Sequence, residues 1–225
     1  MKFIQIFYLL AITLLFACDD FPKDPENTLE RIKGKTIRVG IAEDGKWSGY
    51  YTGEAIGIEA EIIKAYAKTL NANIEWYPGS QEHLIGLLKE YQIDIAIGGF
   101  TESSVFKSHA GFTQPYFTER IKIGAPSNIT ISEEIKNKKV LVKRGSDALL
   151  AVLENNGEPV IYDSLPGILT QLIVAPEDEL KSMGLNISEK DLKEIAHVLA
   201  VPKGENGLLT DLEQFIKDYV KAGKS

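Results

Sequence analysis

Strand and helix patterns alternate over residues 36–98, and this alternation limits the possible folds more than any other feature of the chain. The strand patterns cover Thr36–Ile41, Asn73–Tyr77 and Asp94–Gly98, and the helix patterns cover Ile58–Leu70 and Gln81–Tyr91. In both helix patterns the apolar side chains recur at helical spacing. The order β-α-β-α-β with short links predicts a parallel sheet wound by right-handed crossovers.

A second α/β series follows from residue 120 onward. Its predicted strands are Arg120–Ala125, Lys139–Lys143 and Pro159–Tyr162, and its predicted helices start at Ser132 or span Ala148–Glu154 and Leu165–Leu172. A returning strand over His197–Val201 and a helix over Leu208–Val220 close the chain. We therefore expect two α/β lobes with mainly parallel sheets and flanking helices. The first lobe holds residues 29–117 and 197–225, and the second, shortened lobe holds residues 118–196.

The first candidate binding site lies in the stretch Asp94–Tyr116, where a short buried strand runs into Gly98 and Gly99. Glycines allow another group to approach the backbone closely. The hydroxyl side chains of Thr101, Ser103 and Ser104 follow at the carboxyl end of the strand, where open α/β sheets bind ligands. The alternative is a strand that ends in a polar turn, with the serines acting as helix caps.

A similar turn follows the strand Lys139–Lys143, where Arg144, Gly145 and Ser146 precede a helix. Both turns place a helix start just beyond a strand, so both could face an anion or a polar group. Between the first strand and helix, a Gly-rich loop carries Trp47, Tyr50 and Tyr51. These aromatic side chains either stack on a ligand or pack on the loop itself.

The first residues resemble a bacterial lipoprotein signal. Lys2 precedes an apolar run over Phe3–Phe16, which is shorter than the roughly 20 residues of a membrane-spanning helix. The run ends in Leu15-Phe16-Ala17-Cys18, and Cys18 is the one cysteine of the chain. We expect a signal peptide over residues 1–17, a lipidated Cys18 and a tether over residues 18–28. The alternative is an ordinary signal peptide with an incidental cysteine.

Composition excludes several function classes. The net charge of −7 argues against nucleic acid as a partner, because such binding needs clustered Lys and Arg. His83, His109 and His197 lack the spacing of metal ligands, and we expect them at the surface or at caps. Nor do a catalytic triad order, paired carboxylates or a phosphate loop appear, so we expect no cofactor and no metal.

Several motifs together resemble the family 3 extracellular solute-binding proteins, the receptors of polar amino acid ABC importers. The resemblance runs from Leu29 to Pro126 and continues more weakly in the second lobe. The matching motifs are Leu29–Ile32 with Arg38–Gly40, Gly57–Ile62, Asp94–Tyr116 and Lys139–Ser146.

The resemblance implies a two-lobed fold of the type II periplasmic binding proteins, whose lobes close on a ligand and then engage a permease. It implies a monomer on the periplasmic side of a bacterial membrane, here anchored through Cys18. The residues that we expect to bind the ligand are Asp44, Trp47, Gly98, Gly99, Thr101, Ser103, Arg144 and Ser146.

Two departures from the family pattern change the expected ligand. Phe106 stands where the family has an Arg that grips the ligand carboxylate, and Val105 stands where an acid is usual. Loss of such a charged hydrogen bond costs about 1.5–3 kcal/mol of binding. The family's second-lobe Asp, which holds an amino group, has either Glu177 or Asp178 as its replacement. Arg144 is either a replacement cation or a solvated side chain.

We therefore expect a lipid-anchored solute-binding protein with an altered, small polar ligand rather than an enzyme. One alternative is a receptor or scaffold that does not transport. Another is a dehydratase-like enzyme, which would need a general acid or base among Glu43, Asp44 and Glu102.

Overall fold

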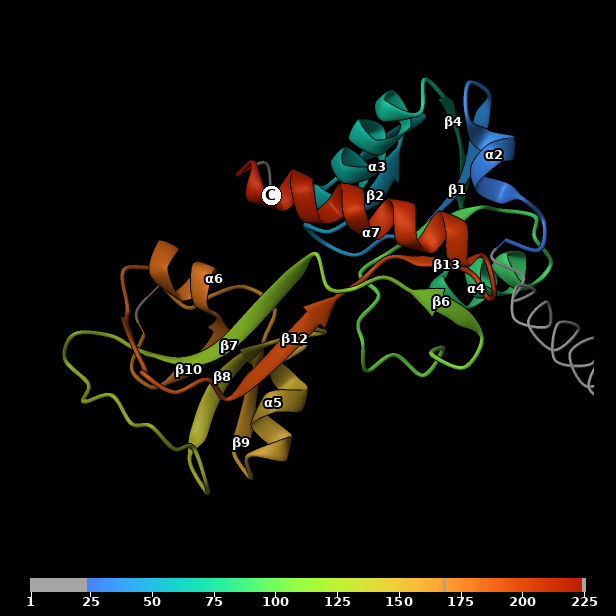
Figure 1. Cartoon of the computed structure of the whole chain (residues 1–225). Helices are drawn as coiled ribbons and strands as arrows, with labels where there is room; N and C mark the ends of the chain where they lie inside the picture. Colours follow the sequence, from blue (N-terminus) through green and yellow to red (C-terminus); the bar gives the residue numbers. More distant parts are fainter. Residues whose placement is uncertain (1–23, 168, 224–225) are drawn as a thin grey trace, which may run out of the picture. The chain divides into compact units, whose positions relative to one another are not determined.

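The computed structural model describes residues 24–167 and 169–223, which divide into two compact units (Figure 1). Unit 1 comprises the described residues up to Phe100, Ser104–Gln114, and those from Leu199 onward. Unit 2 comprises Thr101–Ser103 and Pro115–Val198. The predicted signal peptide and Cys18 lie outside the described residues. Among the residues that are described, no helix is long and apolar enough to span a bilayer.

The sheet of unit 1 has the strand order β4-β1-β5-β13-β6. Its parallel strands are β1 (Thr36–Ile41), β4 (Asn73–Pro78) and β5 (Ile95–Ile97), and its antiparallel strands are β13 (Ala200–Pro202) and β6 (Ala110–Phe112). The predicted parallel series is therefore confirmed, and the completed sheet is mixed. A small separate hairpin of β2 (Gly49–Tyr51) and β3 (Glu54–Ile56) lies in the loop where no strand was predicted.

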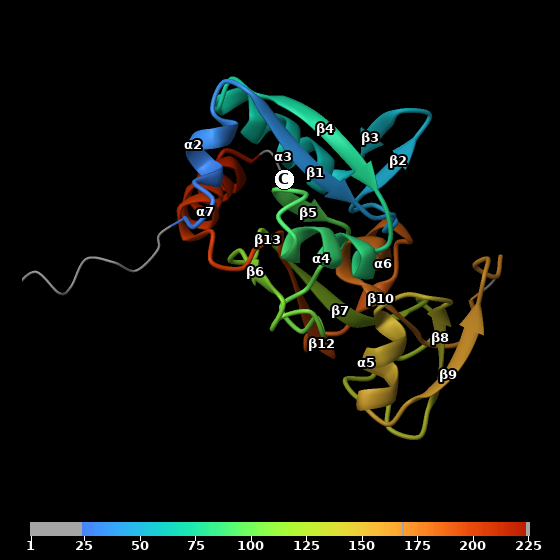
Figure 2. The same ribbon diagram turned by 90° about the vertical axis from the view of Figure 1, so that its right-hand side faces the viewer.

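The helices of unit 1 are α2 (Thr28–Ile32), α3 (Ile58–Thr69), α4 (Gln81–Lys89) and α7 (Asn206–Lys221). Helix α3 lies beside α7, whereas α4 packs against β5, β13 and β6 (Figure 2). The long helices form where apolar side chains recur at helical spacing, as predicted. After α3 the chain turns at Asn71, whose φ of 50° is the left-handed conformation that often ends a helix.

The first turn of α2 is closed by side chains that lie outside the helix. Asn27 makes no side-chain cap. Instead, the backbone N–H of Leu29 donates to Asp24 Oδ2 at 3.0 Å, and that of Thr28 donates to Glu205 Oε2 at 3.3 Å. Glu205 is 1% exposed, and its other oxygen accepts from the backbone N–H of Glu26 at 2.9 Å. Residues 24–28 of the predicted tether are thus bonded to the body of unit 1.

Unit 2 has a mixed sheet with the order β11-β7-β10-β8-β9, and β12 also pairs with β7. The long central strand β7 (Phe117–Ala125) is antiparallel to β10 (Ile173–Pro176), β11 (Asn186–Ile187) and β12 (Lys193–His197). Strand β8 (Lys139–Lys143) is parallel to β9 (Glu158–Tyr162) and to β10. Helix α5 (Ala148–Glu154) has the predicted bounds, and α6 (Glu177–Ser182) was not predicted.

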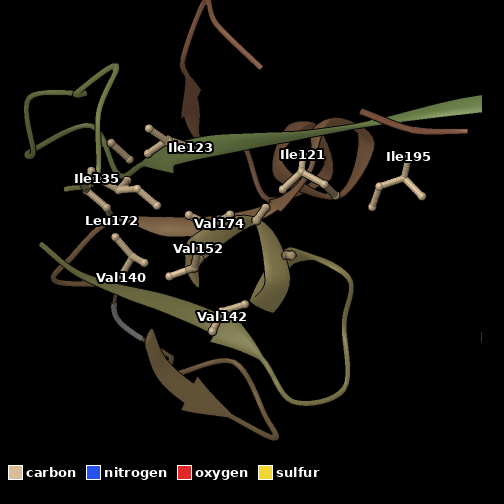
Figure 3. Packing of buried hydrophobic residues seen from close by; sticks show 12 residues of the cluster. Ile121, Ile123, Ile135, Val140, Val142, Val152, Leu172, Val174 and Ile195 are labelled. Atoms are coloured by element: carbon tan, nitrogen blue, oxygen red, sulfur yellow. The ribbon is translucent and has the colours of Figure 1, made fainter. Parts of the chain in front are cut away.

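A hydrophobic core lies between the sheet of unit 2 and helix α5. Figure 3 shows Ile121 and Ile123 of β7 converging with Val140 and Val142 of β8 and with Val152 of α5. These side chains are fully buried because alternate residues of each strand face the helix. A second, smaller cluster packs against Leu180 of α6.

Two helices predicted for unit 2 are wrong. At Ser132 the hydroxyl donates to the carbonyl of Glu134 at 2.7 Å and accepts from its N–H at 3.3 Å, which closes a local turn instead of starting a helix. The segment Leu165–Leu172 holds no helix among its described residues. Pro166 and Gly167 near its start oppose helix formation.

The predicted strand over His197–Val201 is also wrong as a single element. It divides into the end of β12 at His197 and the start of β13 at Ala200. The two pieces belong to the sheets of different units, because β12 pairs with β7 and β13 pairs with β5 and β6.

Candidate functional site

The Gly98-Gly99 turn of unit 1 is held by a buried carboxylate from the first turn of α3. Glu59 accepts from the backbone N–H of Gly98 at 2.7 Å and from that of Gly99 at 3.1 Å. Its side chain is fully buried. The carbonyl of Gly98 accepts from Gln81 Nε2 at 2.5 Å. The N–H groups of Gly98 and Gly99, two residues that we expected to bind the ligand, therefore have a protein partner.

Asp44 lies directly over this turn. Gly99 has a φ of +66°, and a Cβ built on it would lie 1.7 Å from Asp44 Oδ2. Only glycine leaves room for the carboxylate there and adopts this backbone conformation without strain. The loop is closed by the backbone N–H of Asp44, which donates to the Ser48 carbonyl at 2.8 Å. The structure thus brings the predicted residues Asp44, Gly98 and Gly99 together.

Trp47 packs on its own loop, which is one of the two alternatives given for the aromatic side chains. It is 5% exposed, and Lys46 Nζ lies 4.8 Å from the centre of its ring. Its carbonyl accepts from the N–H of Glu59 at 2.9 Å, which satisfies a donor at the start of α3. Tyr51 is exposed, and its hydroxyl donates to Glu43.

Thr101 and Ser103 belong to unit 2, where their hydroxyl oxygens lie 3.1 Å apart. Thr101 forms an isolated bridge with His197, and the N–H of Glu102 donates to Ala196 at 3.0 Å. His197 is 1% exposed, so its predicted surface position is wrong. Its ring lies 6.2 Å from that of Tyr116. The hydroxyl turn is therefore fixed to the end of β12.

Phe106 is part of an aromatic cluster in unit 1. Its ring meets that of Phe100 edge-on, with the centres 6.5 Å apart, and Phe100 also lies 5.9 Å from Phe112. Phe100 is 1% exposed, whereas the neighbouring Val105 is 83% exposed. The phenyl group of Phe106 therefore contributes to packing.

The second turn lies in unit 2, where its residues have protein partners. Arg144 is exposed, and its Nε lies 2.7 Å from Asp163 Oδ1. This hydrogen bond raises the pKa of Arg144 and lowers the pKa of Asp163. The hydroxyl of Ser146 donates to the carbonyl of Lys143 at 2.9 Å. Neither Arg144 nor Ser146 is brought to the charged groove described next.

A groove of about 450 Å³ lies in unit 2 between β7, β12 and α6. Charged side chains from these three elements dominate its lining, which consists of Phe117, Thr118, Glu119, Arg120, Glu177, Asp178, Lys181 and Glu194. Both acids that we considered as replacements for the family's second-lobe Asp line it. The groove gathers six charged side chains, which are Glu119, Arg120, Glu177, Asp178, Lys181 and Glu194.

Glu177 and Asp178 differ in their surroundings. The Glu177 carboxylate lies 2.7 Å from Lys181 Nζ and 2.9 Å from Arg120 Nε. The hydrogen bond from Lys181, together with the charge of Arg120, lowers the pKa of Glu177. Glu177 is thus engaged by two cations, while Asp178 beside it is exposed in the groove lining.

The sequence did not reveal the other lining residues, because β12 was not predicted. Arg120 of β7 and Glu194 of β12 are cross-strand neighbours, so their side chains share one face of the sheet. The period-two pattern of residues 117–123 is visible in the sequence, but its partner strand is not. Among the described residues, no group of three or more His, Cys, Asp or Glu side chains is placed to hold a metal ion.

Residues 37–225 match the model of the bacterial extracellular solute-binding proteins, family 3. The arginine-binding extracellular protein ArtP of Bacillus subtilis (strain 168) is 31% identical over 115 residues, which is 50% of this chain and 45% of that protein. The arginine-binding periplasmic protein of Mannheimia haemolytica is 37% identical over 65 residues, which is 29% and 27% of the two chains. The chain therefore spans less than half the length of the curated relatives it matches.

Solved structures share the fold. An ancestral cationic amino acid solute-binding protein superposes with a TM-score of 0.70 at 21% identity, covering 88% of this chain and 94% of that one. The unliganded, open L-cystine solute receptor of Neisseria gonorrhoeae superposes with a TM-score of 0.67 at 20% identity, covering 87% and 92%. The chain thus has the two-lobed α/β fold of type II periplasmic binding proteins.

Proposed function

Because the chain belongs to the bacterial extracellular solute-binding proteins of family 3, we propose that it binds a small polar solute outside the cytoplasm and delivers it to an ABC permease. The observation that carries this proposal is the charged groove of unit 2. Its lining combines carboxylates, two cations and the aromatic Phe117, which suits a small polar molecule better than an apolar one.

Of the two candidate acids of unit 2, we propose as the ligand residue the one that is more accessible in the groove. A carboxylate that binds a ligand ammonium must be within reach of the ligand. Glu177 is held by both Arg120 and Lys181, whereas Asp178 is exposed at the start of α6. Of the two acids that the sequence left open, we therefore propose Asp178 as the ligand residue.

The site in unit 1 includes Asp44 above the Gly98-Gly99 turn. Glu59 occupies the two glycine N–H groups, so we propose that these glycines act by permitting close approach rather than by donating to the ligand. The hydroxyls of Thr101 and Ser103 and the second-lobe Ser146 remain part of the proposal as polar ligand contacts.

We propose that Cys18 carries the lipid and holds the protein on the periplasmic side of a bacterial membrane, as a monomer with no cofactor. The apolar run before Cys18 supports this proposal. Residues 24–28 are bonded to unit 1, so the tether that lies between the lipid and the bonded segment is short.

An enzymatic role has less support. An ancestral cyclohexadienyl dehydratase superposes with a TM-score of 0.59 at 19% identity, a level that shows the fold alone. Of the three candidate acids, Glu43 accepts from the exposed Tyr51 and Glu102 is itself exposed. Neither has the buried surroundings in which general acids are usually placed.

A binding screen tests the proposed function. The purified mature chain is heated with amino acids, amines, organic acids, sugars and small peptides, and its Tm is recorded for each. We expect a clear rise in Tm with one chemical class, because a ligand that binds the native state stabilises it. If none of these solutes raises the Tm or gives binding heat, the proposed function is wrong.

Transport and sensing are separated by a second measurement. Deletion of the gene from its bacterium should abolish uptake of the radiolabelled solute found in the screen. Uptake at the wild-type rate, together with binding in vitro, would favour the receptor alternative.

A further inference from the structure

A small hollow in unit 1, which we call the basic hollow, is lined by two lysines and none of the expected ligand residues. Its volume is about 250 Å³, and its lining consists of Leu88, Lys89, Tyr91, Ser108, His109 and Lys203. Among the residues that the structure describes, no Asp or Glu belongs to this lining. The lysines come from the end of α4 and from the turn after β13, so the fold brings together two cations that are far apart in the sequence.

Hydrogen bonds between the segments fix the walls of the basic hollow. Lys203 Nζ donates to the carbonyl of Ser108 at 3.0 Å, and the Tyr91 hydroxyl donates to the carbonyl of Lys203 at 3.2 Å. Ser108 Oγ and His109 Nδ1 lie 3.0 Å apart. The turn before β6, the turn after β13 and the end of α4 are thus tied to one another, and the hollow is a built feature of unit 1.

The positive charge of the two lysines is not neutralised within the described part of the chain. Both side chains are exposed, and neither forms an ion pair with a described residue. The protein partner of Lys203 is a carbonyl, which carries no net charge. Glu90 follows Lys89 in the sequence, but its carboxylate accepts from Gln92 Nε2 at 2.7 Å. The basic hollow therefore suits an anion that comes from outside the chain.

The segment that leads to Cys18 joins unit 1 beside Lys203. The next residue, Gly204, lies against the start of the described chain, because a Cβ built on it would lie 3.6 Å from Pro25 Cγ. Six residue steps separate position 18 from position 24, and a fully extended chain of this length spans at most about 20 Å. Acyl chains on Cys18 would therefore hold this end of unit 1 within about 20 Å of the lipid.

We propose that the basic hollow rests on anionic phospholipid headgroups, with Lys89 and Lys203 donating to lipid phosphates while Cys18 anchors the chain. Ammonium groups form charge-assisted hydrogen bonds with phosphate, and lysines near an anionic bilayer are attracted to it. A lipid chain and a basic surface reinforce each other, because the chain keeps the surface close to the headgroups. This inference rests on the proposed lipid attachment at Cys18.

The acidic character of the whole chain gives the contact a consequence. The net charge of −7 means that an anionic bilayer repels the chain as a whole. Attraction at the basic hollow is therefore local, and it gives unit 1 a defined orientation on the membrane instead of free rotation about the tether.

Chemical labelling of lysines on vesicles tests the proposal. The mature chain is coupled through its one cysteine, Cys18, to a maleimide lipid, which places an anchor there whether or not a cell acylates the thiol. One set of vesicles contains phosphatidylcholine alone, and the other contains phosphatidylcholine with phosphatidylglycerol. An acetylating reagent then modifies the exposed lysines, and mass spectrometry gives the rate at each position.

We expect Lys89 and Lys203 to be labelled about fivefold more slowly on the anionic vesicles, the factor that corresponds to about 1 kcal/mol per lysine. Lys68 of α3 and Lys139 of β8 are the controls, because both are exposed and lie outside the basic hollow. Raising the salt concentration from about 0.1 M to about 1 M should remove the difference, since it shortens the screening length from about 10 Å to about 3 Å.

A variant shows whether the two lysines act together. Lys203→Gln should restore fast labelling of Lys89 on the anionic vesicles, whereas Lys68→Gln, which removes the same charge elsewhere in unit 1, should leave Lys89 protected. The Tm of each variant checks that the fold is intact. If Lys203→Gln does not fold, the comparison of the two vesicle compositions with the wild-type chain still decides.

Several results would overturn the proposal. Equal rates on the two kinds of vesicle would do so, as would equal slowing at the two control lysines. Slowing by inorganic phosphate or by polyglutamate, without slowing on the anionic vesicles, would assign the basic hollow to a soluble anion or to an acidic protein instead. These outcomes leave the proposed solute binding untouched, and fractionation of cells with Cys18→Ser tests the natural acylation separately.

Discussion

Glu59 accepts the backbone N–H of Gly98 at 2.7 Å, so a carboxylate from α3 fixes the end of β5 from inside unit 1. The same carboxylate accepts the N–H of Gly99. A turn whose glycines we expected to bind the ligand is therefore held by the protein itself, and Asp44 lies above it.

Replacing this carboxylate should destabilise the protein. Glu59→Gln puts an amide where two N–H donors need an acceptor, and we expect a loss of about 2–3 kcal/mol in the free energy of unfolding. Urea denaturation measures it. Glu61→Gln is the control in the same helical turn, because Glu61 is exposed and forms a surface pair with Lys64 at 2.8 Å. A surface pair of this kind contributes about 0–1 kcal/mol. Similar losses for both variants would contradict the supporting role.

The Glu205 carboxylate should control the order of the segment before α2. Glu205→Gln weakens the acceptor for Glu26 and Thr28, and we expect a loss of about 1–3 kcal/mol together with faster amide exchange over residues 26–29. Hydrogen exchange measured by mass spectrometry resolves this segment. Asp218→Asn on helix α7, which begins directly after Glu205, is the control and should leave the exchange of residues 26–29 unchanged.

Burial of the Asp24 carboxylate raises its pKa, with the N–H of Leu29 opposing the shift. A raised pKa in the folded state means that the protonated form is favoured by folding. The stabilising effect is complete below the unfolded pKa of 3.8 and is lost as the pH rises through the higher folded value. Relative to the wild type, Asp24→Asn should therefore gain stability as the pH rises from 3 to 7. If the Tm of the wild type and that of the variant change in parallel from pH 3 to 7, the raised pKa of Asp24 is refuted.

Phe106 offers a test of the expectation that this chain lacks the family's carboxylate clamp. Phe106→Arg should lower stability by about 1–3 kcal/mol through loss of the contact with Phe100, while raising the affinity for amino acids relative to their amines. Phe106→Leu removes the same aromatic contact without adding a cation, so it should lose stability with no change in the affinity ratio. Calorimetry with arginine and agmatine measures the ratio. If Phe106→Arg leaves it at the wild-type value, position 106 does not contact the ligand.

Lipid attachment at Cys18 has a simple test. Cys18→Ser should move the protein from the membrane fraction to the soluble fraction, because the serine hydroxyl cannot replace the acylated thiol. Fractionation followed by immunoblotting detects the shift, and a Ser225→Ala variant serves as the control. Membrane retention of Cys18→Ser would show that another feature anchors the protein.

Local patterns predicted the helices and strands in which apolar side chains recur at a regular spacing. Helix α5 has the predicted bounds, and α3 and β1 agree closely, because each buries one regular face. The apolar run over residues 198–201 misled the prediction, since its continuous hydrophobicity conceals the passage from β12 to β13. The caps of α2 were missed for a different reason, because Glu205 is far away in the sequence.

The candidate site was predicted only in part, because some of its residues are brought together by contacts that local sequence patterns do not reveal. Asp44, Gly98 and Gly99 follow neighbouring parallel strands, so local reasoning brings them together. The groove of unit 2 depends on the pairing of Arg120 with Glu194, which is a property of strand register rather than of any local pattern. The sequence also could not decide between Glu177 and Asp178, because the two cations that hold Glu177 come from β7 and α6.

The passage from β12 to β13 has a consequence for the order in which the two units can fold. Strand β13 lies between β5 and β6, so the sheet of unit 1 lacks an internal strand until residues 200–202 have emerged. Unit 2 is built from residues 101–103 and 115–198, all of which precede that strand. Its sheet can therefore close while the earlier-synthesised unit 1 still exposes the edges of β5 and β6. Unit 1 therefore begins first and is completed last. Until residues 200–202 are in place, its exposed strand edges are prone to aggregation.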